Sequence, residues 1–453
     1  MASFYVQGCF AHAIAPGEIE IVPDGLIAIA DDGRIEDVSA PGRPEHEAHA
    51  QRAAASGAIT KLGPRQMLTP GFVDLHIHAP QWPQAGTALH LSLADWLRGK
   101  TFPLEVRYAD IAFARRVYDS LVDTLIANGT TTALYFATIH AEASLALAEI
   151  CLARGQRAFI GKVAMDHPDS CPVYYRDASA AEAIAATSDF IARVASLQGN
   201  ESKLAQGVIT PRFIPSCTDA LLEGLGDLAQ STGAAVQTHC SESDWEAGHV
   251  RERFGLSDSH CLHRFGLMTR RTVLAHSNFI DDADMALIAE RGAGVAHCPL
   301  SNFYFANSVF PLRKALEKGL HVGLGTDISG GPSPSMFDAC RMAIAASRGL
   351  NDGVDPDVAP ESRGRPGSSI DFRTAFWLAT AGGGQALDAP IGQFKPGYQF
   401  DALLLDPDAP GSNVVSFDAE EPEILLQKLI YNAGRANIAS VWIGGRQVRG
   451  ERA

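Results

Sequence analysis

The segment Thr69-Pro-Gly-Phe-Val-Asp-Leu-His-Ile-His78 places two imidazoles two residues apart at the end of an apolar run. The run is typical of a β-strand, in which successive side chains point to opposite faces. We therefore expect His76 and His78 to share one face and Ile77 to take the other, so that the two rings can bind one metal ion. Because a lone His-x-His is weak evidence in a chain with 15 histidines, the prediction depends on polar residues further along.

Strand-like and helix-like segments alternate over much of the chain. Eight apolar runs are predicted as strands, at residues 72–78, 131–138, 158–165, 207–213, 234–239, 272–276, 294–297 and 321–326. Helical patterns lie between them, including 108–128, 144–154, 218–230, 282–291 and 311–318, and several of them end in glycine. Alternation of this kind over roughly 250 residues predicts the α/β class and a (β/α)8 TIM-type barrel. The alternative is an open doubly wound sheet, but no Gly-x-Gly-x-x-Gly or phosphate-loop motif follows an early strand.

Both flanks of the predicted barrel carry β-type patterns with turn signals. The runs are residues 18–22, 26–30, 397–405 and 439–443, with turn candidates at 32–33 and 444–445. They predict a second, small composite β domain in which the two ends of the chain meet. The predicted division is 1–68, 69–390 and 391–453, with the barrel in the middle. Residues 45–55 show no convincing period and are predicted as a surface connection, and 354–369 as a long loop.

Composition limits the possible partners. With 453 residues and 46% hydrophobic content, the chain can bury a large core. The net charge of −15 without a basic stripe argues against nucleic acid and leaves a small neutral substrate. No apolar run approaches the ~20 residues that a membrane span requires. The eight cysteines include no Cys-x-x-Cys pair, and the first residues lack the order of a signal peptide, so we predict a cytoplasmic protein.

Polar side chains stand where the predicted strands end, which is the side of such a barrel that carries active sites. They are His76 and His78 on the first strand, His239 on the fifth, His276 on the sixth, His297 on the seventh and Asp327 after the eighth. Three imidazoles and one carboxylate suit Zn²⁺ with an open position for water. The alternative is a set of core histidines satisfied by hydrogen bonds.

Glu242 follows His239 by three residues, which carries it off the strand and over the mouth of the barrel. A carboxylate beside a metal can take a proton from water and pass it to a ring nitrogen. The alternative is a solvated loop acid equivalent to Asp244 or Glu246. Cys240 and Cys298 adjoin site histidines, but neighbouring residues of a strand face opposite ways, so they are predicted as buried thiols rather than ligands.

These residues resemble the amidohydrolase superfamily of metal-dependent hydrolases, and within it the guanine deaminases. The superfamily pattern is met by residues 70–78, His239 with Glu242, His276 in Leu-Ala-His, His297 in His-Cys-Pro-Leu-Ser-Asn302, and Asp327. Longer strings resemble the guanine deaminases, at residues 78–81, 101–105, 128–132, 135–140, 210–213, 325–331 and 396–401. The resemblance covers nearly the whole chain.

The resemblance implies one zinc per chain, held by His76, His78, His239 and Asp327. Glu242 would act as proton shuttle, His276 would orient the attacking hydroxide, and Asp327 would relay a proton to the departing amine. Lys162 is the candidate for the carboxylated lysine that bridges two metals in other members. Its place on the third predicted strand and the His-x-x-Glu signature on the fifth favour the one-metal arrangement.

The implied reaction is hydrolysis of guanine by water to xanthine and ammonia, in a homodimer. Substrate contacts would come from Gln81, Arg212 and Phe213, together with His239, Glu242 and Asp327. One alternative is a hydrolase for another aminated ring, such as a triazine, a pterin or another purine. A second is a non-catalytic barrel homologue that binds or scaffolds, but such a protein would lack ligands, and every ligand position is filled here.

Overall fold

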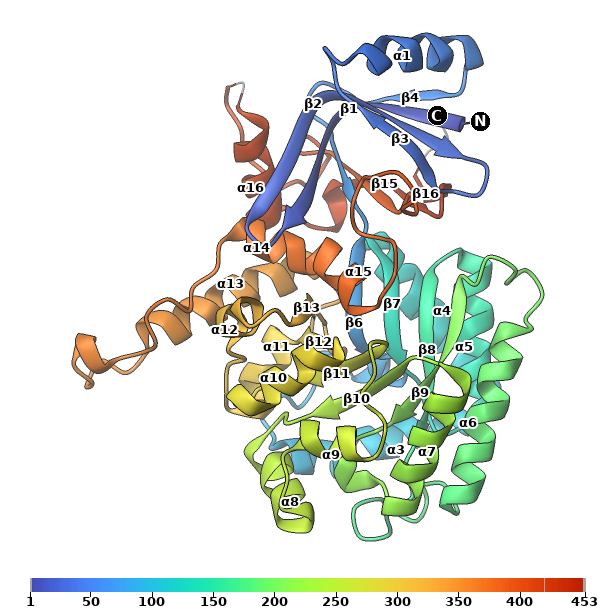
Figure 1. The fold of residues 1–453 in the computed structure, drawn as a ribbon, viewed down its shortest axis with the longest axis vertical. Coiled ribbons are helices and arrows are strands. Elements are labelled where there is room, and N and C mark those ends of the chain that lie inside the picture. Colours follow the sequence, from blue (N-terminus) through green and yellow to red (C-terminus); the bar gives the residue numbers. More distant parts are fainter. Residues whose placement is uncertain (1, 419, 451–453) are drawn as a thin grey trace.

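The computed structural model describes residues 2–418 and 420–450, and its centre is an eight-stranded parallel sheet with the strands in chain order (Figure 1). The strands are β6 (Phe72–His78), β7 (Thr130–Phe136), β8 (Arg157–Ala164), β9 (Ala205–Pro211), β10 (Val236–Cys240), β11 (Thr272–His276), β12 (Gly294–His297) and β13 (His321–Leu324). The first and last strands meet where Asp327 N–H donates to His76 O at 2.8 Å and His78 N–H donates to Ile328 O at 2.7 Å. The sheet thus closes into the predicted (β/α)8 barrel.

Helices cover the outside of this barrel. The longer ones are α4 (Ile111–Ala127), α5 (Ala141–Arg154), α6 (Ala180–Ala195), α7 (Asp219–Thr232), α8 (Asp244–Phe254), α9 (Asp258–Arg264), α10 (Asp282–Arg291), α12 (Leu312–Glu317) and α13 (Met336–Asp352). Local signals define their ends: the Asp110 carboxylate accepts from Ala112 N–H and begins α4, and Gly155 ends α5 with a φ of +77°.

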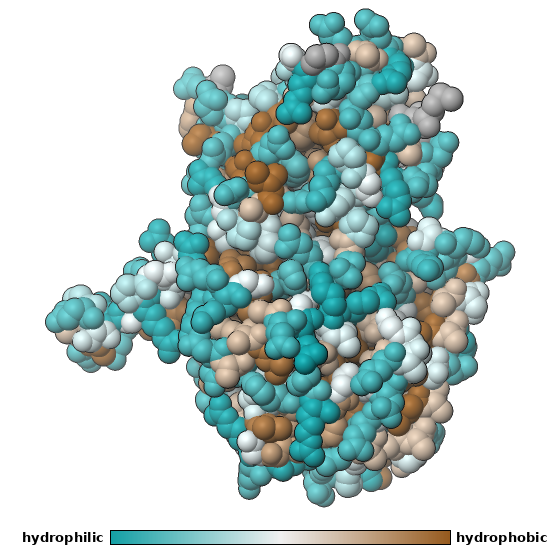
Figure 2. All heavy atoms as spheres, viewed as in Figure 1, coloured by the Kyte–Doolittle hydropathy of each residue, from teal (hydrophilic) through white to brown (hydrophobic). Residues whose placement is uncertain are grey.

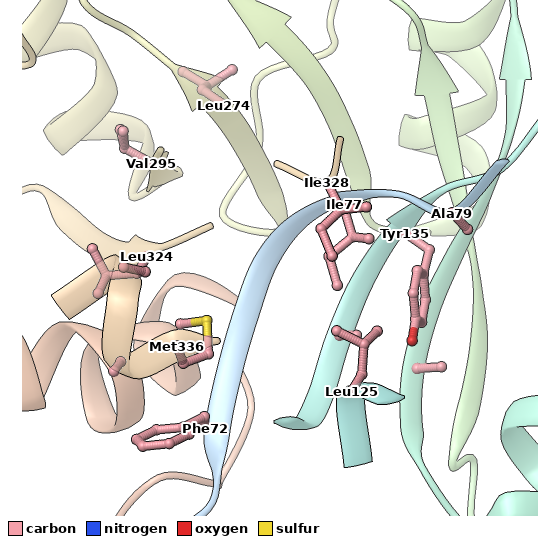
Figure 3. Close-up of a cluster of buried hydrophobic side chains, with 14 of the residues drawn as sticks. Phe72, Ile77, Ala79, Leu125, Tyr135, Leu274, Val295, Leu324, Ile328 and Met336 are labelled. Atoms are coloured by element: carbon pink, nitrogen blue, oxygen red, sulfur yellow. The ribbon is translucent and has the colours of Figure 1, made fainter. Parts of the chain in front are cut away.

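Two apolar layers result from the alternation of side chains along the strands. Between strands and helices lies the main core, and Figure 3 shows Phe72 and Ile77 of β6 there with Leu125 of α4 and Met336 of α13. A smaller cluster that includes Val73 fills the barrel itself. Ile77 therefore faces the helices while the two histidines beside it face the site, as the sequence predicts.

The second sheet joins both ends of the chain, so the predicted composite β part is confirmed. Its strands are β1 (Ala2–Ala15), β2 (Glu18–Ala30), β3 (Ile35–Ser39), β4 (Ile59–Lys61), β5 (Met67–Pro70), β14 (Ala402–Leu405), β15 (Ile438–Ile443) and β16 (Arg446–Arg449). Gly444 and Gly445 form the predicted turn between the last two strands, with φ of +54° and +75°. The division of the chain at residues 68 and 390 remains a prediction, and β5 crosses the first of these boundaries.

The prediction for residues 45–55 was wrong, because α1 (Pro44–Ser56) is a helix over the second sheet. Five alanines favour a helix although no strong apolar period is present. Glu45 and Glu47 suit its first turn, and Gly57 ends it with a φ of +66°. The apolar period did not reveal this helix, because only a small part of one helix face is buried against the second sheet.

Residues 354–369 form the predicted loop, interrupted only by the short 3-10 turn η6 (Pro360–Ser362). It continues from α13 and projects from the body of the molecule (orange, left in Figure 1). Figure 2 shows the same projection on a largely hydrophilic face, and Val354 in it is 86% exposed. Within the described residues, every helix is too short or too polar to cross a membrane.

Candidate active site

Three imidazoles and one carboxylate converge at the carboxyl end of the barrel. His76 and His78 end β6, His239 lies near the end of β10, and Asp327 follows β13. The Nε2 atoms of His78 and His239 are 3.0 Å apart. Asp327 Oδ1 lies 3.3 Å from His76 Nε2 and 3.6 Å from His78 Nε2. The structure therefore brings together all four predicted ligands.

The cluster fits a metal ion. Nitrogen and oxygen atoms about 2.0–2.1 Å from a tetrahedral ion lie about 3.4 Å from one another, which matches the separations here. Burial, followed by the charges of neighbouring groups, lowers the pKa values of His76, His78 and His239 well below the ordinary range, so the rings are neutral and can act as ligands. Both ring nitrogens of His76 are buried without a hydrogen-bond partner among the described residues, and an ion would satisfy one of them.

Groups around the cluster fix the direction of its side chains. His239 Nδ1 donates to the Arg212 carbonyl at 2.5 Å, which leaves Nε2 as the ligand atom. The buried Asp74 carboxylate accepts from His76 N–H at 3.2 Å and from Thr326 N–H at 3.0 Å, so it joins the first strand to the last. Its pKa is raised to about 7 by burial.

The main chain adopts an unusual conformation at two of the site residues. His276 and Asp327 have φ values of +68° and +50°, in the left-handed region that other residues than glycine rarely adopt. Each such residue costs about 1–3 kcal/mol, and such strain concentrates where function fixes a side chain. Here it turns both side chains toward the cluster as the chain leaves the barrel.

His276 lies beside the cluster in a fixed tautomer. The Glu242 carbonyl can only accept, so the Asn278 amide that donates to it at 3.0 Å has its nitrogen on that side. The same nitrogen donates to Asn302 Oδ1 at 3.1 Å, and this oxygen accepts from His276 Nδ1 at 3.0 Å. Nδ1 therefore carries the proton, and the neutral ring presents an unprotonated Nε2, 3.8 Å from both Glu242 Oε1 and Asp327 Oδ2.

Glu242 is set apart from the acids that follow it. Its side chain lines the cavity, and burial raises its pKa to about 8, with the Asp327 carboxylate adding to the effect. Asp244 is exposed on the surface. Glu246 is buried, but its Oε2 accepts from Glu242 N–H at 2.8 Å and so supports the loop instead of facing the cavity.

At the end of the seventh strand, the prediction that His297 faces the site and Cys298 faces away was wrong. His297 points away from the cluster and packs on Phe310, with ring centroids 5.3 Å apart. Cys298 instead belongs to the apolar cluster inside the barrel. The thiol is buried as predicted but faces inward, because the alternation along β12, with Val295 outward and Ala296 inward, continues through His297 and Cys298. Burial raises the pKa of this thiol well above the ordinary value, and its Sγ lies within 4.8 Å of ring nitrogens of His76 and His276, so the thiol borders the cluster from inside the barrel.

The predicted substrate-binding residues surround one cavity next to the cluster. Its lining includes Gln81, Arg212 and Phe213 as well as His78, His239, Glu242 and Asp327. The outer wall comes from Leu93, Trp96 and Leu97, at the junction of α2 (Leu93–Trp96) and the π-helix η2 (Leu97–Thr101), and from Phe305 of the π-helix η5 (Asn302–Ala306). The rings of Trp96 and Phe305 are 5.0 Å apart and close this wall.

Lys162 lies apart from the cavity. Its Nζ is 2.6 Å from Asp177 Oδ1, and both side chains are buried. Because Gly161 beside it faces Thr210 inside the barrel, Lys162 points to the opposite side of β8. The geometry agrees with the one-metal arrangement.

Several site residues were missed in the sequence. Asp74 carried a signal, since it is an acid between Val73 and Leu75 of a buried strand. Phe136 lies against the histidines, with ring centroids 4.9 Å from His76 and 4.8 Å from His239, but nothing distinguishes it from a core aromatic in the sequence. Asn302 was named only as part of the family pattern, and the roles of Asn302 and Asn278 could not be predicted, because they depend on contacts between separate loops.

The fold and the site define a (β/α)8-barrel hydrolase with a metal site built from imidazole and carboxylate groups. A family model described as "Amidohydrolase family" matches residues 67–448. The chain belongs to the amidohydrolase family, whose members are metal-dependent.

Individual relatives are similar over nearly their whole length. The guanine deaminase of Dictyostelium discoideum is 37% identical over 457 residues, which are 98% of this chain and 97% of the relative. The guanine deaminase of Homo sapiens is 36% identical over 450 residues, or 98% and 96% of the two chains. The crystal structure of guanine deaminase from C. acetobutylicum with bound guanine in the active site superposes with a TM-score of 0.86 at 28% identity, covering 98% of this chain and 99% of that chain.

Proposed function

We propose that the protein is a zinc-dependent deaminase that converts guanine and water to xanthine and ammonia. The observation that carries the proposal is a single cavity that joins three kinds of group: the metal-type cluster, the carboxyl group of Glu242 and the donor Arg212. The choice of guanine as the substrate rests on the similarity to the guanine deaminases named above, which extends over 98% of this chain.

The metal cluster and the two nearby carboxyl groups divide the chemistry. Zinc held by His76, His78, His239 and Asp327 would make water acidic enough to act as a nucleophile at neutral pH. Glu242 accepts a proton from the attacking water and passes it to the ring nitrogen next to the reacting carbon, which its raised pKa suits.

Two further side chains complete the reaction. His276 accepts a hydrogen bond at its unprotonated Nε2 and so orients the attacking water, because its other nitrogen is committed to Asn302. Asp327 relays the second proton to the exocyclic amine, which leaves as ammonia. The oxygen of water replaces this nitrogen on the ring, so the atoms balance.

Recognition of the ring comes from the opposite side of the cavity. Arg212 has only donors, so it satisfies the O6 of guanine and meets an amine at that position donor against donor. Phe213 packs on the ring beside His239, with centroids of the two side chains 6.2 Å apart. Gln81 contacts a second edge.

Ammonia release from a panel of rings tests the function. Guanine should be the best substrate among guanine, 2,6-diaminopurine, a pterin and an aminotriazine. 2,6-Diaminopurine keeps the reactive 2-amino group but replaces O6, and kcat/KM should drop by as much as ~10⁴-fold. Arg212→Ala should narrow this gap by slowing guanine. Faster turnover of the triazine or pterin would favour the alternative function, and equal turnover of both purines would remove Arg212 from recognition.

We also propose that the protein is a cytoplasmic homodimer. All eight cysteines are free, which agrees with a reducing compartment. Apolar side chains at and before α16 (Pro422–Asn432) are exposed, among them Phe417 at 92% and Ile424 at 45%, as at a surface that contacts a second copy. Sedimentation velocity should give twice the mass of one chain.

A further inference from the structure

A buried carboxylate outside the cavity holds both groups that are proposed to recognise the ring. Glu105 ends α3 (Phe102–Glu105) and is 0% exposed. Its Oε2 accepts from Arg212 Nη1 at 2.6 Å, and its Oε1 accepts from Arg212 Nη2 at 3.2 Å and from Gln81 Nε2 at 2.9 Å. Glu105 lies in one of the strings that resemble guanine deaminases, but neither that resemblance nor the mechanism above gives it a role.

These contacts fix the orientation of the Gln81 amide. A carboxylate only accepts, so Nε2 of Gln81 must face Glu105. At the other end, Ser329 N–H, which only donates, lies 3.3 Å from Gln81 Oε1. The amide therefore cannot rotate by half a turn without losing both contacts, and it presents one defined N–H and one defined lone pair to the cavity.

Glu105 also fixes the position and balances the charge of Arg212. Arg212 is 2% exposed, and its guanidinium lies over the Phe102 ring, 5.1 Å from the ring centroid. A charge buried this deeply requires a paired carboxylate. Two of the five N–H groups are used in the pair, so the others can face a ligand. The pair has no net charge, which suits a neutral ring with a carbonyl group.

We propose that Glu105 is a positioning residue for substrate specificity, which aligns Arg212 and Gln81 as one recognition unit for a neutral purine, with Arg212 at the carbonyl-bearing edge and Gln81 at a second edge. The inference rests on the proposed function. It predicts that specificity is lost when Glu105 changes, although Glu105 does not touch the ring.

Glu105→Gln tests this directly. The introduced amide has one acceptor oxygen where three N–H groups now bind, so Arg212 and Gln81 cannot both be held. We expect kcat/KM for guanine to fall by about 10-fold to 100-fold, as for loss of hydrogen bonds to a charged group. Turnover of 2,6-diaminopurine should change less, so the ratio of the two substrates should narrow by at least about tenfold.

A matched control is available at the other side of the barrel. Asp401 holds Arg157 in a similar buried pair, with two contacts of 3.1 Å. Asp401→Asn should lower the melting temperature but leave the substrate ratio unchanged. The double variant of Glu105→Gln with Arg212→Ala should show the same ratio as Arg212→Ala alone, because Glu105 acts on the O6 edge through that arginine.

The outcomes are distinct. A folded Glu105→Gln protein with normal metal content and an unchanged substrate ratio would overturn the inference, as would an equal loss of ratio in Asp401→Asn. If Glu105→Gln does not fold, Glu105→Asp keeps the charge on a shorter side chain. It should still narrow the ratio, and a ratio equal to that of the wild type would overturn the inference. Absence of guanine turnover by the wild type would instead reject the proposed function.

Discussion

Glu242 and Asp327 are both buried carboxyl groups at the mouth of the barrel, yet their surroundings differ. Asp327 Oδ1 lies within 3.6 Å of two imidazole nitrogens and so belongs to the metal cluster. Glu242 is held by its main chain instead, through Glu246 and Asn278, which leaves its carboxyl group for the cavity. The geometry therefore favours Asp327 as ligand and Glu242 as proton carrier.

Glu242→Gln keeps the shape of the side chain and removes the proton acceptor. We expect the chemical step to slow by ~10²-fold to 10⁴-fold while the metal content stays the same. Single-turnover kinetics and metal analysis of the same preparation measure both quantities. Loss of metal from this variant, with retention in Asp327→Asn, would mean that the two roles are exchanged.

The tautomer of His276 can be tested through Asn302. Asn302→Ala removes the acceptor for Nδ1, and we expect kcat to fall by about 10-fold to 100-fold, as for other groups that orient histidines at metal sites. Asn302→Asp keeps an acceptor there, so it should retain more activity than the alanine variant. Equal kcat values for the two variants would argue against the assigned role.

The loop that carries Glu242 is supported by a pair of buried acids. Glu246 accepts from Glu242 N–H, and Asp258 accepts from Ser241 N–H at 3.1 Å. Burial raises the pKa of Glu246 well above its usual value, and the Asp258 carboxyl group lies close enough to Glu246 to raise it further. Burial also raises the pKa of Asp258, so the folded protein favours the protonated form of these acids more than the unfolded chain does.

This pair predicts a pH dependence of stability. An acid whose pKa is higher in the folded than in the unfolded state destabilises the fold as the pH rises above its unfolded value, about 4.3 for glutamate, toward its folded value. Glu246→Gln mimics the protonated form, so its fold is not destabilised in this way as the pH rises. Its free energy of unfolding should increase relative to wild type as the pH rises above about 4.3, by up to about 1.4 kcal/mol per pH unit. A difference independent of pH would contradict the raised pKa of Glu246.

The strands and helices of the barrel could be predicted because each repeats one simple pattern. The residues Phe72–His78 and Thr272–His276 match the predicted strands without change. The facing of His297 and Cys298 could not be predicted, because alternation shows only that neighbouring side chains face opposite ways, and not which of the two faces into the barrel. The hydrogen bonds of Glu105 and Asn302 join segments far apart in the sequence, and no local period records them.

The barrel and the mixed sheet are joined by a buried ion pair. The Asp401 carboxylate accepts from Arg157 of β8 and, at 2.6 Å, from Gly444 N–H in the turn before β16. Both charged side chains are nearly inaccessible to water. The pair therefore links the carboxyl-terminal strands to the amino end of barrel strand β8 and accounts for Asp401 in the segment at residues 396–401.

Removing one partner of this pair leaves a buried charge without its counterion. We expect Asp401→Asn to lower the free energy of unfolding by about 3 kcal/mol or more, because breaking a buried pair typically costs this much. Chemical denaturation of both proteins measures the difference. A loss smaller than about 1 kcal/mol, the usual value of an exposed pair, would show that this contact does not hold the two sheets together.

Catalysis is proposed to depend on a single metal ion per chain. Metal content measured together with guanine turnover on the same purified protein tests it directly. We predict about one equivalent of zinc per chain, with activity that is lost on treatment with a strong chelator and restored by zinc. Two equivalents would require a second set of ligands, for which Lys162 is the candidate bridging residue. A fully active preparation with almost no metal would contradict the account.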